Sequence, residues 1–226
     1  MPTSVRSCFD AVGLIVDGPV NYGDRVPDSR PGVYVVTHDR DPDAADPTFR
    51  YEAHISSKAI AHWILRVPKM RVCIDGCMVP PSPRDVKKRL VEFWLPHESI
   101  LYIGKAGTAS PSRRGIDERA GALYRHKLGN PSPHRGGHWL KTLADLEDKF
   151  ILWAPVVDGR APECVEHAMI AHFVSGVTHE VRLTLRDSDH PFPWANLEHS
   201  KRSRKKHGLR HQTRSRAEPC VLPSAG

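Results

Sequence analysis

The chain has 226 residues, of which 39% are hydrophobic and 26% charged, a balance that suits one substantial globular domain. No apolar run approaches the roughly 20 residues that cross a membrane, and Asp10 and Asp17 interrupt the first apolar stretch. This pattern excludes a membrane-spanning helix, and we expect a cytoplasmic protein with no membrane partner.

The net charge of +7 is concentrated near the C-terminus. Residues 201–216 hold eight basic residues and no acid, whereas the rest of the chain is formally close to neutral. Such a run attracts polyanions because Lys and Arg release the counterions of a phosphate backbone. We expect residues 199–226 to be a basic, disordered tail, and a solvated tail without specific contacts is the alternative. The tail residues expected to contact nucleic acid are Lys201, Arg202, Arg204, Lys205 and Lys206.

The first half of the chain predicts two strands and an insertion. A strand is expected over residues 9–20, ending at a Gly-Pro turn, and a second over residues 32–37, which are rich in Val and Tyr. The loop that follows opens an insertion over about residues 39–98. Within it we expect a helix after Ser56 or Ser57, a strand at 71–76 and a helix that begins at Ser82.

The second half predicts alternating strands and helices. The expected strands cover residues 100–107 and 149–155, and the expected helices cover 115–127, a short segment from His138, and 162–175. Residues 178–190 are mixed and leave one more helix open. Together these elements indicate an α+β domain over residues 9–198.

The strands at 32–37 and 100–107 each carry one tyrosine. Because side chains alternate along a strand, the aliphatic neighbours of Tyr34 and Tyr102 point to the face opposite the phenols. If the two strands pair, both phenols emerge on one side, beside backbone that Gly104 leaves open. We expect this surface to be the floor of an active site.

The predicted helix over residues 162–175 carries a carboxylate on its apolar face. Met169, Ile170 and Phe173 follow Glu166 at positions +3, +4 and +7. A carboxylate in such a place needs a partner or a metal ion, and a lone carboxylate with water ligands suits Mg²⁺. Glu163 is the alternative ligand, and a salt bridge is the alternative role for Glu166.

The tripeptides Gly32-Val33-Tyr34 and Tyr102-Ile103-Gly104 together resemble the signature of the GIY-YIG nuclease family. The resemblance implies a small three-stranded antiparallel sheet flanked by helices, here with a helical insertion between the two signature strands. It further implies a metal-dependent endonuclease, a hydrolase that cleaves phosphodiester bonds in DNA with Mg²⁺ or Mn²⁺. A catalytically inactive nucleic-acid-binding protein of the same fold is the alternative, and an interaction protein whose basic tail meets an acidic partner is a third. Double-strand cleavage would need a homodimer or two successive nicks.

The same resemblance assigns roles to single residues. The family's two tyrosines, helix arginine, metal-binding helix glutamate and late asparagine match Tyr34, Tyr102, Arg119, Glu166 and Asn196. Tyr34 is expected to act as a general base or to position water, with Tyr102 as its hydrogen-bonding partner. A free phenol has a pKa of about 10, so Tyr34 would need help to accept a proton. Lys105 would supply that help if the chain turns at Gly104.

Two positions of the family pattern stay open. A His or Tyr often lies four residues after the arginine, but Leu123 stands there in this chain, which leaves Tyr124 and His126 as alternatives. Arg113 and Arg114 are rivals for the arginine itself and candidate contacts to nucleic acid.

Overall fold

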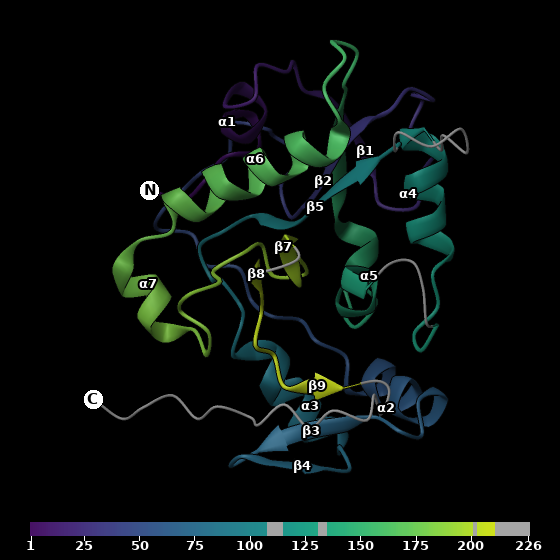
Figure 1. The fold of residues 1–226 in the computed structure, drawn as a ribbon, viewed down its shortest axis with the longest axis vertical. Coiled ribbons are helices and arrows are strands. Elements are labelled where there is room, and N and C mark those ends of the chain that lie inside the picture. Colours follow the sequence, from purple (N-terminus) through teal and green to yellow (C-terminus); the bar gives the residue numbers. More distant parts are fainter. Residues whose placement is uncertain (108–114, 131–134, 201–202, 211–226) are drawn as a thin grey trace.

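The central element of the fold is a four-stranded antiparallel sheet with the strand order β1-β6-β2-β5 (Figure 1). The computed structural model describes residues 1–107, 115–130, 135–200 and 203–210. The strands of this sheet are β1 (Asp17–Asn21), β2 (Gly32–Thr37), β5 (Ile100–Ala106) and β6 (Phe150–Pro155). The molecule is mixed α+β, as expected. Its main sheet has one strand more than the expected three, because β1 pairs with β6.

Strand β2 lies in the interior of the sheet, between β5 and β6, and each of its residues is buried. In its pairing with β5, Tyr34 lies opposite Gly104 and Val36 lies opposite Tyr102. Residues opposite each other on paired strands point to the same face of a sheet. The two tyrosines therefore share one face, and the prediction that their strands pair across the insertion is confirmed.

Helices cover both faces of this sheet (Figure 1). On one face, Val33 and Val35 pack in a hydrophobic cluster with α1 (Val5–Asp10) and α6 (Pro162–Gly176). On the other face, Tyr34 packs in a second cluster with residues of α4 (Ile116–Arg125) and α5 (Arg135–Leu140). The 3-10 helix η1 (Leu146–Asp148) precedes β6, and α7 (His179–Thr184) follows α6. The tyrosine face is thus part of the core.

The insertion, which we expected to be mainly helical with a strand at 71–76, contains two helices and a β-hairpin whose first strand is the expected one. Its elements are α2 (Ser57–Arg66), β3 (Arg71–Ile74), β4 (Cys77–Val79) and α3 (Pro83–Val91). The Ser56 side chain accepts a hydrogen bond from the Ala59 N–H, and Ser82 and Asp85 form a capping box. Both serines start their helices where the sequence predicts, because each satisfies a backbone N–H that has no partner inside the helix.

The described part of the C-terminal region is folded, whereas we expected a disordered tail. It forms β7 (Glu198–Ser200), β8 (Ser203–Arg204) and β9 (Leu209–Arg210). Strand β9 pairs with β3 of the insertion, in a sheet with the order β4-β3-β9 (Figure 1). Leu209 lies opposite Val72 and is buried, and this apolar contact explains why the segment is ordered despite its charge.

The N-terminal prediction is wrong in its first half. Phe9 and Asp10 belong to helix α1, and the strand begins only at Asp17. The hydroxyl of Ser4 accepts a hydrogen bond from the N–H of Ser7 and so caps the helix, a local signal that outweighs the apolar run.

Within the described residues, no helix has both the length and the apolar character needed to cross a membrane.

Candidate active site

The two tyrosines meet above Gly104. The ring centroids of Tyr34 and Tyr102 are 6.0 Å apart, and the rings are tilted by 51°. A Cβ atom on Gly104 would lie 2.6 Å from Cε1 of Tyr102, 2.6 Å from Cζ of Tyr34 and 2.7 Å from the Tyr34 hydroxyl oxygen. Any side chain at this position would displace both rings. The glycine is therefore required by the packing of the two phenols.

Both phenols are protonated at neutral pH. The Tyr34 side chain is fully buried, and its hydroxyl group has no hydrogen-bond partner of normal geometry among the described residues. Burial raises the pKa of Tyr34 well above its usual value, and the neighbouring Tyr102 raises it further. Burial also raises the pKa of Tyr102, and the charge of Glu166 acts in the same direction. Each phenol can therefore donate a hydrogen bond more readily than it can accept a proton.

Arg119 supplies positive charge close to the two phenols. It lies in α4, whose first turn donates backbone hydrogen bonds to the loop at residues 28–30, just before β2. The charge of Arg119 opposes the upward pKa shifts that burial produces in Tyr34, Tyr102 and Glu166. Among the residues that the sequence nominated, Arg119 and Glu166 thus both act through their charge on the two tyrosines.

Glu166 lies on α6 beside the edge strand β5, with its side chain 13% exposed. Its Oε2 is 3.0 Å from Nζ of Lys105, and that Nζ is also 2.8 Å from Oε1 of Glu163. Burial raises the pKa of Glu166, and the positive charge of Lys105 opposes the shift. Lys105 lies opposite Val33, on the face of the sheet that α6 covers. The chain does not turn at Gly104, so Lys105 points to these carboxylates and away from the tyrosine face.

Asn196 holds the free edge of β5. Its Oδ1 accepts a hydrogen bond from the Ile103 N–H at 2.9 Å, and its Nδ2 donates to the Ile103 carbonyl oxygen at 2.8 Å. The N–H of Ala195 donates to the carbonyl oxygen of Leu101 at 2.8 Å. Asn196 is buried, so its amide acts as a short substitute for a neighbouring strand. It orders the strand of Tyr102 through its two hydrogen bonds to Ile103.

Tyr124 and His126 face other neighbours. The Tyr124 ring packs edge-on against Tyr22, with the centroids 4.9 Å apart. His126 ends α4, and its ring lies 4.5 Å from that of His138, between centroids. Burial lowers the pKa of His126 to about 4, so its imidazole is neutral at pH 7. Both residues line the core beneath α4.

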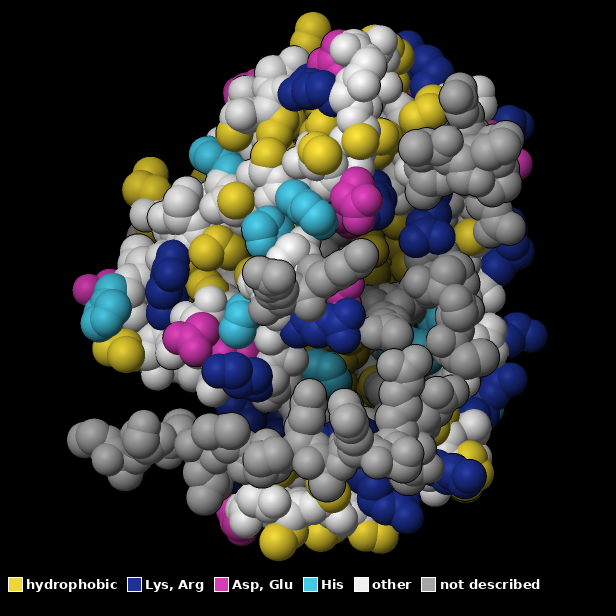
Figure 2. Space-filling view, viewed as in Figure 1, with side chains coloured by type: hydrophobic (Ala, Val, Ile, Leu, Met, Phe, Trp, Pro, Cys, Tyr) yellow, Lys and Arg dark blue, Asp and Glu magenta, His cyan; other side chains and the backbone are white. Residues whose placement is uncertain are grey.

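Of the residues nominated for nucleic-acid binding, the structure describes only three. Arg204 pairs with Glu198 at 2.9 Å, Lys206 pairs with Asp189 at 3.3 Å, and Lys205 is buried. In the view of Figure 2, the described Lys and Arg side chains are spread along the right edge and across the lower half, with acids among them. The four others, Arg113, Arg114, Lys201 and Arg202, lie outside the described residues.

Two other features lie away from the tyrosines. Asp187, Asp189 and His190 place potential metal-ligating atoms within 4.8 Å of one another. Asp187 already accepts a hydrogen bond from the Lys206 N–H at 2.6 Å, and its carboxylate lies 3.0 Å from Nδ1 of His190. These contacts use the carboxylate of Asp187 within the protein itself.

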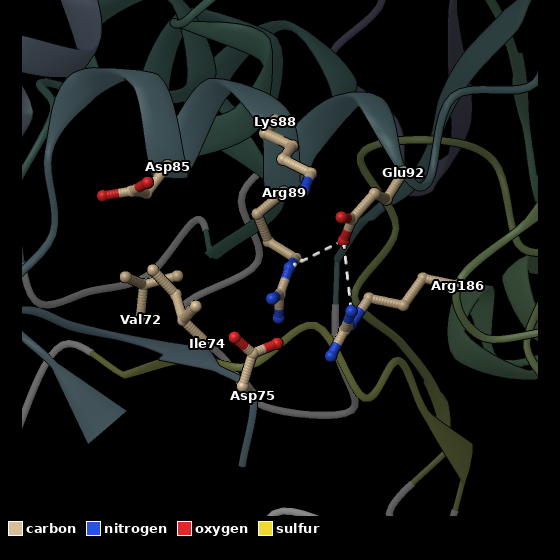
Figure 3. Close-up of a pocket in the computed structure, with 8 residues that line it drawn as sticks. All are labelled: Val72, Ile74, Asp75, Asp85, Lys88, Arg89, Glu92 and Arg186. Carbon is tan, nitrogen blue, oxygen red and sulfur yellow. Dashed lines mark hydrogen bonds and ion pairs between the residues drawn. The ribbon is translucent and has the colours of Figure 1, made fainter. Parts of the chain in front are cut away.

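The second feature is a cavity of about 260 Å³ in the insertion, lined by charges of both signs. Figure 3 shows Arg89 at its centre, ion-paired with Glu92, which also meets Arg186. The guanidinium of Arg89 further donates to backbone carbonyl oxygens of Cys73 and His207. Charged side chains that line this cavity thus pair with one another, and its lining includes none of the nominated catalytic residues.

Comparison with known proteins yields no match to a family model, a curated protein or a solved structure. The contact that the sequence reasoning missed is the bridge from Lys105 to Glu163 and Glu166. The alternation of side chains along β5 could have indicated this contact, because it places Lys105 on the face of the sheet opposite Tyr102.

Proposed function

We propose that the protein is a divalent-metal-dependent endonuclease of the GIY-YIG type that hydrolyses phosphodiester bonds in DNA. The observation that carries the proposal is the convergence, around strand β5, of two phenols, a guanidinium and a nearly buried carboxylate. Beyond the effect of burial, the pKa values of both tyrosines respond to the charges of Arg119 and Glu166. In this proposal β2, β5 and β6 form the nuclease sheet, and β1 is an addition to it.

The residues at Glu166 fit a divalent cation. Burial raises the pKa of this carboxyl group, so its ionised form needs positive charge close by. Glu166 would hold Mg²⁺ or Mn²⁺, with water and phosphate oxygens as further ligands. When bound, the ion supplies neutralisation of the charge on the phosphate and the leaving oxygen.

The chain's own side chains position the substrate. The protonated hydroxyl of Tyr34, for which the described residues supply no hydrogen-bond partner of normal geometry, can donate a hydrogen bond to a water molecule or a phosphate oxygen and fix its direction of approach. The raised pKa of Tyr34 supports this role over that of a general base. Arg119 stabilises negative charge on the phosphate, and Asn196 keeps the strand of Tyr102 in place.

The test is the Glu166→Gln variant, which removes the charge and keeps the shape. We expect nicking of supercoiled plasmid in Mg²⁺ to fall by about 100-fold or more, with duplex binding unchanged. Glu147→Gln, at an exposed site in η1, is the matched control and should cleave like the wild type. Undiminished cleavage by the Glu166 variant would rule out the assignment. Linear plasmid without a nicked intermediate would indicate a homodimer that cuts both strands.

A second candidate function is DNA binding without catalysis. The observation that favours it is the Lys105 ammonium, which already forms ion pairs with the Glu163 and Glu166 carboxylates. In that case neither Mg²⁺ nor Mn²⁺ would elicit nicking, while binding to random duplex would persist and weaken steeply with salt.

A further inference from the structure

The Lys105 ammonium lies between two carboxylates of one helix. Its Nζ is 2.8 Å from Oε1 of Glu163 and 3.0 Å from Oε2 of Glu166. The two acids are three residues apart on α6, so they emerge on the same side of the helix, one turn from each other. The Lys105 ammonium is thus at contact distance from two anions, an arrangement in which carboxylates also hold metal ions.

The surroundings disfavour an uncompensated negative charge on Glu166. The Glu166 side chain is nearly buried, at 13% exposed, whereas Glu163 is 64% exposed and opens the pair to solvent. The fully buried Tyr34 points to the opposite face of the sheet. After burial and Tyr102, the charges that act on that phenol are those of Arg119 and Glu166. A cation is therefore needed here whether or not a metal ion is present.

We propose that the Lys105 ammonium is a resident counter-ion that occupies the cation position shared by Glu163 and Glu166. A divalent ion binds only by displacing it, and Glu163 then serves as a ligand beside Glu166. This inference rests on the proposed function, because it concerns the metal site of that same centre. Two cations cannot share the gap, since an ammonium and a divalent ion a few ångströms apart repel strongly at low dielectric.

Displacement is physically accessible to this side chain. Lys105 stands on the edge strand β5, its side chain is 25% exposed, and the ion pair with Glu163 faces solvent. A lysine stem has four rotatable bonds, so Nζ can swing away from α6 without movement of the strand. The consequence is that the metal affinity of the wild type is set below that of the bare carboxylate pair.

The test is direct binding of Mn²⁺, measured by isothermal titration calorimetry without DNA. We expect Lys105→Met to bind Mn²⁺ about tenfold more tightly than the wild type, because the competing charge is gone. Glu163→Gln should bind about tenfold more weakly, and Glu166→Gln should show no binding. Lys69→Met, at an exposed lysine of the insertion, is the control and should match the wild type.

Thermal unfolding gives a second readout that does not depend on activity. Without metal, Lys105→Met should melt below the wild type, and added Mn²⁺ should raise its melting temperature by more than that of the wild type. If this variant does not fold, Lys105→Gln carries the same comparison. Equal or weaker Mn²⁺ binding after loss of Lys105, or full binding by either Glu variant, overturns the inference. The proposed function fails on a different result, which is undiminished DNA cleavage by Glu166→Gln.

Discussion

The hydroxyl of Tyr34 is a buried polar group without a described partner. Such groups reduce the free energy of unfolding, so their presence in a folded protein calls for an explanation such as a functional role. Tyr34→Phe should leave the free energy of unfolding unchanged or raise it by about 1 kcal/mol, because a desolvated hydroxyl is removed. Plasmid cleavage should fall by about 100-fold if this hydroxyl orients water or phosphate. Urea denaturation and a nicking assay measure the two effects.

A second tyrosine provides the opposite case for comparison. The hydroxyl of Tyr51, in the insertion, donates a hydrogen bond to Asp39. Tyr51→Phe should therefore cost about 1 kcal/mol of stability and leave cleavage unchanged. If Tyr34→Phe instead lost stability and kept full activity, the hydroxyl would be a structural group and the positioning role would be wrong.

Glu98 makes stability depend on pH in an unusual direction for an acid. Burial raises its pKa from 4.5 to about 7, although the Thr3 N–H donates to its Oε2 at 3.0 Å. Between these two values the folded state binds a proton that the unfolded state has lost. The stabilisation is thus complete below pH 4.5 and is lost as the pH rises through 7.

Glu98→Gln removes this titration and keeps an acceptor for Thr3. Relative to the wild type, the variant should gain stability between pH 5 and pH 8, by up to about 3 kcal/mol. Urea denaturation at the two pH values measures the change, and Glu147→Gln at an exposed site should show none. An equal stability difference at both pH values would show that Glu98 has an ordinary pKa.

At the level of elements, strand β5 depends on a clamp made by a side chain. It is an edge strand, and its outer side is paired by the Asn196 amide, which makes both hydrogen bonds to Ile103. Asn196→Ala would leave the buried N–H and carbonyl oxygen of Ile103 unpaired. We expect a loss of about 2–4 kcal/mol in the free energy of unfolding and faster hydrogen exchange at the Ile103 amide. Asn21→Ala, which removes an exposed hydrogen bond to Asp24, should stay within about 0.5 kcal/mol of the wild type.

An unchanged exchange rate at Ile103 would contradict the clamp, because local opening of β5 is the expected route of exchange. Loss of stability without faster exchange at this amide would indicate a general packing defect of the loop at 193–196 instead.

The main strands could be predicted from the sequence because their signals are local. Alternation and flanking turn residues identify β2, β5 and β6, and serine caps place the starts of α2 and α3. The clamp by Asn196 could not be derived in this way, since its partner Ile103 is 93 residues away along the chain. The two-residue strand β9 is too short to carry a pattern, and only its pairing with β3 defines it.

On the scale of the whole molecule, one buried lysine joins three regions. The Lys205 Nζ lies over the ring of Phe93, which follows α3 of the insertion, at 5.9 Å from the centroid. It lies over the ring of Trp139 in α5 at 5.5 Å. It also donates to the carbonyl oxygens of Pro193 and Trp194 at 2.9 Å each, in the loop that carries the β5 clamp. A basic run in a sequence gives no sign of such burial, because the partners come from distant segments.

Lys205→Met therefore tests whether the C-terminal segment supports the candidate active site. The substitution keeps the apolar stem but leaves the carbonyl oxygens of Pro193 and Trp194 without their donor. Loss of these bonds is only partly offset by relief of a desolvated amine, whose pKa burial lowers well below its usual value. We expect a loss of about 1–3 kcal/mol in the free energy of unfolding and faster hydrogen exchange at Ile103.

The neighbouring Lys206 offers a matched control, because its side chain is exposed and, among the side chains that the structure describes, pairs with Asp189 at 3.3 Å. Lys206→Met should change stability by less than about 0.5 kcal/mol and leave exchange at Ile103 untouched. Equal effects of the two substitutions would mean that the segment acts through its charge alone. A larger effect at Lys205 that reaches Ile103 would mean that residues 203–210 hold strand β5, and with it Tyr102, in register with β2.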